Sequence, residues 1–130
     1  MLQALCHHGN PHRLVVLVGG DPGIGKSTLM LQMAMEMADK QKVLYVSGEE
    51  SERQIKMRAL RILKDDQGET GDIPEGLYLV TETNLDVIIE HNESVKRDLL
   101  VLDSIQTTYL PQLESAAGSV SQVRESASRL

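Results

Sequence analysis

A glycine-rich segment, GGDPGIGKST at residues 19–28, holds the most specific chemical pattern in this sequence. Residues 20–27 fit the spacing G-x-x-x-x-G-K-[ST], in which glycines let successive backbone N–H groups turn toward one anion. Lys26 supplies a mobile cation for the β- and γ-phosphates of a nucleotide, and the Ser27 hydroxyl is a suitable ligand for Mg²⁺. The expected nucleotide-binding residues are Gly20, Asp21, Pro22, Gly23, Ile24, Gly25, Lys26, Ser27 and Thr28, with Lys26 also catalytic.

Acidic residues follow two other apolar runs. Asp103 comes directly after residues 99–102, at the expected carboxyl end of a buried strand, where α/β sheets place ligand groups. A carboxylate there can hold Mg²⁺ through a bound water, so Asp103 is the second expected metal ligand. Glu49 and Glu50 follow residues 43–46, and a carboxylate at that sheet edge can orient and deprotonate an attacking water.

The two adjacent glutamates leave an alternative open. Glu49 is the first acid after the strand and is the preferred catalytic base. Glu50 is the other candidate, although it can instead stabilise the following helix electrostatically as an acid near the helix N-terminus. A shared role for the two carboxylates also remains possible.

Hydrophobic periodicity predicts the elements that position these residues. Continuous apolar runs predict strands, and the first run indicates a strand buried on both faces. The expected strands are residues 14–18, 43–46, 77–80 and 99–102. The expected helices are residues 27–38, residues 85–89 and two that begin at the capping pairs Ser51 with Gln54 and Ser119 with Gln122. This alternation predicts an α/β domain with a parallel sheet flanked by helices.

The domain boundaries follow from the same patterns. Residues 1–13 carry no strand or helix signal and are expected to be irregular, whereas residues 14–130 form the domain. The last helical pattern runs to residue 130 without a C-terminal capping signal. We therefore expect a partial domain that is truncated at its C-terminus and lacks further strands.

The composition of the chain argues against several classes of protein. The chain has 130 residues and a formal net charge of -6, so it has no bulk electrostatic attraction to nucleic acid or to anionic membranes. Cys6 is the only cysteine, which excludes a multi-cysteine zinc site within this chain. The apolar runs are far shorter than the roughly 18 residues that a membrane span needs, so we expect a cytoplasmic protein without a membrane partner.

Three segments together resemble one family. These are GGDPGIGKSTLMLQ, VLYVSGEESERQIKMRALRI and LLVLDSIQTTYLPQLESAAGSVSQVRE, and the similarity runs from about residue 15 to residue 130. They are similar to the ATPase core of the bacterial RadA (Sms) DNA repair proteins, which are relatives of RecA. SGEES and the serine-glycine stretch before SQVRE are more specific for this family than the phosphate loop is.

The resemblance implies a RecA-like P-loop ATPase core that uses ATP and Mg²⁺. It also implies DNA repair and recombination, with single-stranded DNA as a partner and a homo-oligomeric ring in the full-length form. In such folds the acid after the second strand is catalytic, which corresponds to Glu49. The same resemblance places residues 112–122 near DNA, although that segment contains no Lys or Arg.

Two alternatives accompany this interpretation. Replicative helicases and KaiC share the phosphate loop and the acidic residues, so another RecA-like ATPase is possible. A nucleotide-binding fragment that does not turn over is the second alternative, because we expect an incomplete sheet.

Overall fold

The structure, a computed structural model, describes residues 2–7, 14–64 and 66–130. Strands and helices alternate along most of this length, which is the arrangement expected of an α/β domain. In chain order the elements are β1 (Leu2–His7), β2 (Leu14–Gly19), α1 (Lys26–Ala38), β3 (Val43–Ser47), α2 (Glu52–Ile62), β4 (Leu77–Thr81), α3 (Leu85–Val95), β5 (Leu99–Asp103) and α4 (Val120–Arg129).

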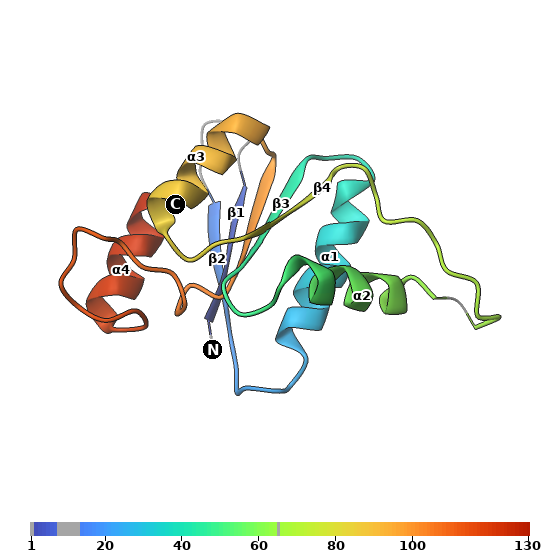
Figure 1. Ribbon diagram of the computed structural model, residues 1–130, viewed down its shortest axis with the longest axis horizontal. Coiled ribbons are helices and arrows are strands. Elements are labelled where there is room, and N and C mark those ends of the chain that lie inside the picture. The colour runs from blue at the N-terminus through green and yellow to red at the C-terminus, as the bar shows by residue number, and fades with distance from the viewer. Residues whose placement is uncertain (1, 8–13, 65) are drawn as a thin grey trace.

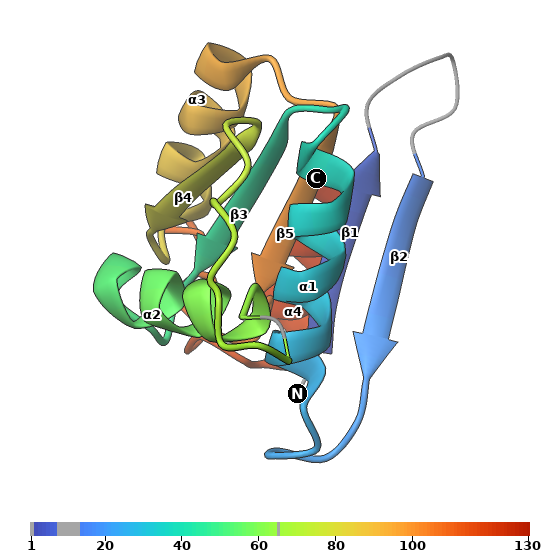
Figure 2. The same ribbon diagram turned by 90° about the vertical axis from the view of Figure 1, so that its right-hand side faces the viewer.

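One sheet of order β2-β1-β5-β3-β4 forms the centre of the domain. β3 pairs in parallel with both β4 and β5, whereas β1 is antiparallel to both β2 and β5. Since β1 reverses direction relative to each neighbour, β2 runs the same way as β5. The carboxyl ends of β2, β3, β4 and β5 therefore lie at one edge of the sheet, as Figure 2 shows.

Helices cover both faces of this sheet. α1 and α2 lie on one face, and α3 and α4 lie on the other (Figure 1). Successive strand side chains point to opposite faces, so Val43 and Tyr45 pack in the cluster under α1 and α2, whereas Leu44 and Val46 pack in the cluster under α3 and α4. All of β3 and β5 is buried between these layers, and the expected α/β class with parallel strands flanked by helices is confirmed.

The N-terminal segment differs from the prediction. Residues 2–7, expected to be irregular, form β1 and pair with β2 from Leu2 opposite Gly19 to His7 opposite Leu14. Residue 1 and residues 8–13 lie outside the described part of the chain. The short sequence of β1 has little strand propensity of its own, so its conformation depends on two neighbouring strands that are distant in sequence. A turn signal, Gly9-Asn10-Pro11, was the available indication of a hairpin.

β2 is also less buried than its sequence indicates. Val15, Val16 and Leu17 are 37%, 41% and 50% exposed, so the prediction of a strand buried on both faces is wrong. β2 lies at the sheet edge, because β1 separates it from the buried strand β5. In addition, α1 packs over β3, β4 and β5. The apolar run therefore predicts the strand correctly but overestimates how deeply the strand is buried.

The expected capping residues mark the starts of α2 and α4 in the structure. Ser51 and Gln54 form the expected capping box at α2, with reciprocal bonds between each side chain and the other residue's backbone N–H. α3 is longer than the expected residues 85–89 and ends at Val95, followed by the C-cap residue Lys96, which has a left-handed backbone. Among the described residues no helix is both long and apolar enough to cross a membrane.

Candidate nucleotide-binding site

The segment between β2 and α1 forms an exposed loop that ends at the helix N-terminus. Gly25 is the N-cap of α1 and has φ of 94°, a left-handed conformation that glycine adopts without strain. No side chain caps this helix end. The N–H groups of the first turn and the positive end of the helix dipole are therefore available to an anion at the loop.

Lys26 holds the loop in place. Its side chain is nearly buried, and Nζ donates hydrogen bonds to the carbonyl oxygens of Gly20 at 2.7 Å and of Asp21 at 2.5 Å. The ammonium group therefore lies inside the loop that the sequence assigns to phosphate. A carbonyl is a weaker partner for an ammonium group than a phosphate oxygen, so a bound phosphate can replace these contacts.

A cavity of about 250 Å³ opens beside this loop. Five of its lining residues belong to the predicted phosphate-binding segment, and the sixth comes from α2. They are Gly23, Gly25, Lys26, Ser27, Thr28 and Arg58. The structure thus brings the loop, the first turn of α1 and one arginine around a common space, and the arginine was absent from the sequence-based prediction.

Asp103 lies at the same edge of the sheet and is joined to the loop by a tyrosine. Asp103 is buried, and its Oδ2 accepts a 2.8 Å hydrogen bond from the hydroxyl of Tyr45 in the neighbouring strand β3. The same hydroxyl lies 3.5 Å from the backbone oxygen of Ser27. The Tyr45 hydroxyl therefore lies between the end of β5 and the first turn of α1, and it donates its proton to Asp103.

The environment keeps Tyr45 protonated. Burial raises the pKa of its hydroxyl far above the ordinary value, and the charge of Asp103 and the hydrogen bond to Asp103 raise it further. The hydroxyl consequently stays a donor at physiological pH, and it orients the carboxylate of Asp103. The sequence pattern does not indicate this role, because Tyr45 fits the apolar pattern of a core strand.

The donor chemistry of Ser27 and Asp103 fits a magnesium ion. A hydroxyl and a carboxylate are hard oxygen ligands, and the Tyr45 hydroxyl lies close to the Asp103 carboxylate and to the backbone oxygen of Ser27. Within the described residues no three His, Cys, Asp or Glu side chains gather as a metal site. A magnesium ion here would accordingly take most of its ligands from phosphate oxygens and water, which is usual for nucleotide sites.

Glu49 and Glu50 follow β3, and the structure distinguishes them. Ser47 Oγ accepts hydrogen bonds from the backbone N–H groups of both glutamates, at 3.4 and 3.1 Å. The carboxylate of Glu50 forms an ion pair with Arg58, whose side chain is 13% exposed. Glu49 is exposed and, in the described part of the chain, has no such partner. Its carboxylate is therefore the more available of the two.

A third carboxylate at this edge has a local structural role. Glu82 follows β4, and its Oε1 accepts hydrogen bonds from the backbone N–H groups of Thr83 and Asn84. These two bonds hold the pKa of Glu82 below its ordinary value. Its charge stabilises the turn that leads into α3.

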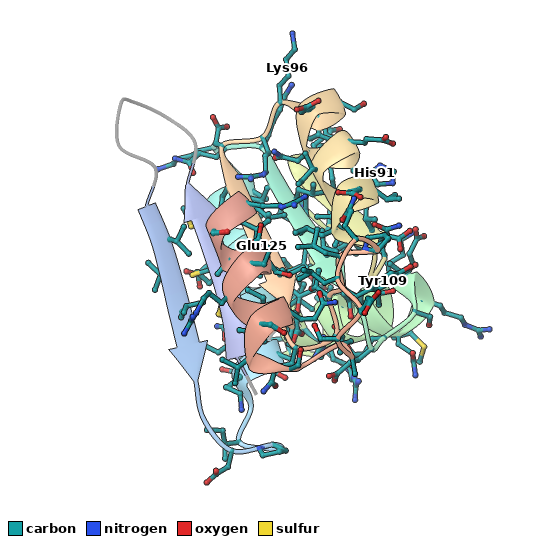
Figure 3. All side chains as sticks on the ribbon, turned by 90° about the vertical axis from the view of Figure 1, so that its left-hand side faces the viewer. His91, Lys96, Tyr109 and Glu125 are labelled. Atoms are coloured by element: carbon teal, nitrogen blue, oxygen red, sulfur yellow. The ribbon has the colours of Figure 1, made fainter. Side chains whose placement is uncertain are left out.

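The segment expected near DNA contains an inward-facing glutamine. Gln122 is 1% exposed, accepts a 2.9 Å hydrogen bond from the Leu110 N–H and donates one of 2.9 Å to the Ser115 oxygen. Ser119 caps α4 as predicted, but the Gln122 side chain bonds to the preceding loop. Figure 3 shows this face of the molecule, with Tyr109 on the loop and Glu125 on α4. Gln122 thus organises the loop rather than presenting its side chain for a ligand.

The fold and this site define an α/β nucleotide-binding domain of the P-loop class. The AAA domain family matches residues 2–127, and the chain belongs to that family. Over 111 residues it is 51% identical to the DNA repair protein RadA of Streptococcus pyogenes serotype M6 and 52% identical to that of Aquifex aeolicus. It is 54% identical over 112 residues to the DNA repair protein RadA of Listeria monocytogenes.

These matches confirm the resemblance to the RadA proteins. Each covers 85% of this chain but 23% of the relative. The chain therefore spans about a quarter of the length of the curated relatives it matches.

Proposed function

We propose that this chain binds ATP with Mg²⁺ at the phosphate loop and forms part of a DNA repair ATPase. The observation that carries the proposal is the cavity lined by Gly23, residues 25–28 and Arg58, together with the Tyr45 hydroxyl, which lies close to both Asp103 and the Ser27 backbone. Lys26 and the loop N–H groups would bind the phosphates. Ser27 would ligate Mg²⁺ directly, and Asp103 would do so through a water.

Hydrolysis would use Glu49 as the base. Its carboxylate follows the central strand β3, at the edge where the phosphate loop also lies, and it is exposed to water. A carboxylate in that place can orient a water molecule and accept its proton. Bound Mg²⁺ would supply charge neutralisation at the transferred phosphate.

The connection to DNA rests on the relatives. The matched proteins are named DNA repair proteins, which supports DNA repair as part of this proposal. Recombination, single-stranded DNA and a ring of subunits enter the proposal through the family resemblance alone. The local chemistry of residues 112–122 adds little, since the segment has no cation and Gln122 is buried. Tyr109, 37% exposed, is the residue of this loop able to stack on a base. We assign the protein to the cytoplasm as part of the same proposal.

Calorimetric titration with Mg²⁺ and a non-hydrolysable ATP analogue tests the nucleotide site. The wild-type chain should bind saturably, and Lys26→Ala should weaken binding by about 100-fold or more, because a charge-assisted phosphate contact is lost. Lys40→Ala is the matched control, since Lys40 is an exposed lysine just after α1. Equal affinity for the analogue in the two variants would contradict the assignment of Lys26.

Turnover requires a separate measurement. Glu49→Gln should retain binding of the analogue and remove ATP hydrolysis, whereas Glu52→Gln, on the exposed start of α2, should leave both binding and hydrolysis unchanged. Binding without hydrolysis in the wild-type chain would favour the nucleotide-binding alternative over the ATPase.

A further inference from the structure

Arg58 lines the cavity from outside the predicted phosphate-binding segment, residues 20–28. It lies on α2, which packs beside α1 on the same face of the sheet (Figure 1). Arg58 lines the same cavity as Lys26 and Ser27. The fold therefore brings a second cation to the phosphate loop from within the same chain.

The hydrogen bonding of Arg58 is incomplete. Nη2 is ion-paired with Glu50, but the buried Nε has no hydrogen-bond partner among the described residues. A guanidinium has five N–H donors and matches the geometry of carboxylates and phosphates. A buried donor without a partner is unfavourable, so a rearrangement of the Arg58 guanidinium around an acceptor that enters the cavity would be favourable.

We propose that Arg58 contacts the terminal phosphate of ATP and that Glu50 is the residue that positions it beforehand. This inference rests on the proposed function, because it needs a nucleotide in the cavity. The terminal phosphate carries charge that ADP lacks, so an arginine aimed at it distinguishes ATP from ADP. Glu50 neutralises the guanidinium until the phosphate competes for it.

The proposal predicts opposite changes in affinity for ATP when Arg58 and its ion-pair partner Glu50 are each replaced. Removing the Arg58 charge deletes a phosphate contact, whereas removing the Glu50 charge releases Arg58 from its competitor. An ion pair that only fastened α2 to the end of β3 would predict the same direction for both changes. The contrast between the two variants therefore separates a ligand role from a purely structural role.

The experiment is calorimetric titration with Mg²⁺ and either a non-hydrolysable ATP analogue or ADP. Arg58→Met should weaken analogue binding by about 10-fold or more and ADP binding by less than about 3-fold, since it loses a charge-assisted contact to the terminal phosphate. Glu50→Gln should tighten analogue binding by about 2- to 5-fold. Arg53→Met, on the exposed side of α2, is the matched control and should change neither affinity.

Folding and the wild type provide the remaining controls. Urea unfolding identifies a variant that does not fold. If Arg58→Met does not fold, Arg58→Lys takes its place. Arg58→Lys should lose part of the preference for ATP over ADP, because the positive charge stays but the planar, forked geometry of the guanidinium is lost. Equal weakening for both nucleotides, no weakening, or a weaker Glu50→Gln would overturn the proposal. Failure of the wild type to bind either nucleotide would instead overturn the proposed function, and the role of Arg58 with it.

Discussion

The hydroxyl of Tyr45 donates a 2.8 Å hydrogen bond to the carboxylate of Asp103, and both side chains are buried. The two residues belong to neighbouring parallel strands, and the same hydroxyl lies close to the backbone of Ser27. A core residue of the sheet thus fixes the orientation of the proposed metal ligand. This arrangement connects the packing of the domain to the chemistry of its site.

Replacing Tyr45 with phenylalanine should impair Mg²⁺ use more than nucleotide binding itself. The change removes the donor that orients Asp103, so the Mg²⁺ concentration that gives half-maximal binding of an ATP analogue should rise several-fold. The free energy of unfolding should fall by about 1–3 kcal/mol, because a charge-assisted hydrogen bond in the core is lost. Magnesium titrations at fixed analogue concentration, with urea unfolding alongside, measure both effects.

Tyr78→Phe is the control for that prediction. Tyr78 lies on β4 and is 39% exposed, so removal of its hydroxyl should change neither quantity. If Tyr45→Phe and Tyr78→Phe had the same Mg²⁺ dependence, Tyr45 would not position Asp103.

The free energy of unfolding should fall at alkaline pH, because the Tyr45 hydroxyl is buried in the folded protein. Burial raises the pKa of Tyr45 in the folded state, so above pH 10 the unfolded chain releases this proton while the folded chain keeps it. The unfolded state then binds fewer protons, and the free energy of unfolding decreases with rising pH by up to about 1.4 kcal/mol per pH unit. Below pH 10 this contribution is constant.

Urea unfolding at pH 9, 10 and 11 checks this behaviour. Tyr45→Phe should show a shallower decline than the wild type, because the other titrating groups are common to both proteins. Parallel curves for the two proteins would show that the Tyr45 proton does not contribute to the pH dependence.

The sequence predicts most elements of this fold because their signals are local. β3 and β5 are continuous apolar runs, and the Ser51 capping box marks the start of α2. β1 was missed because its pairing partners are distant in sequence, and the burial of β2 was overestimated because no local pattern shows which strand lies at an edge.

The residues of the candidate site also fall into two groups, those that the sequence predicts and those that it does not. The phosphate loop and Asp103 are predicted from motif spacing, since the proposed chemistry depends on residues close together in the chain or at a strand end. Tyr45 and Arg58 were missed, because each resembles an ordinary core or helix-surface residue until the fold brings it to the site. Only the arrangement of β3, β5 and α2 shows their contacts.

Gln122→Ala should destabilise the protein, whereas Gln112→Ala should not. Gln122 is buried and bonded to the Leu110 and Ser115 backbones, so its loss leaves backbone groups unsatisfied at a cost of about 2–3 kcal/mol. Gln112, in the same loop, is exposed and bonds to Asp86, and its loss should cost less than about 0.5 kcal/mol. Urea unfolding of both variants gives the comparison, and equal stability would mean that Gln122 does not hold the loop.

Gly48→Ala should disturb the segment that carries the two glutamates. A Cβ at Gly48 would clash with Thr107 Oγ1 and would lie 2.8 Å from Thr107 Cβ, so the turn after β3 must move away from the loop after β5. We expect a loss of about 1–3 kcal/mol in stability and a further loss of ATP hydrolysis, because Glu49 is adjacent. Gly71→Ala is the matched control, since its Cβ would approach no atom closer than 3.8 Å. Hydrolysis rates compared at matched occupancy by nucleotide separate the two effects, and normal turnover by Gly48→Ala would show that the close approach to Thr107 is not needed to position Glu49.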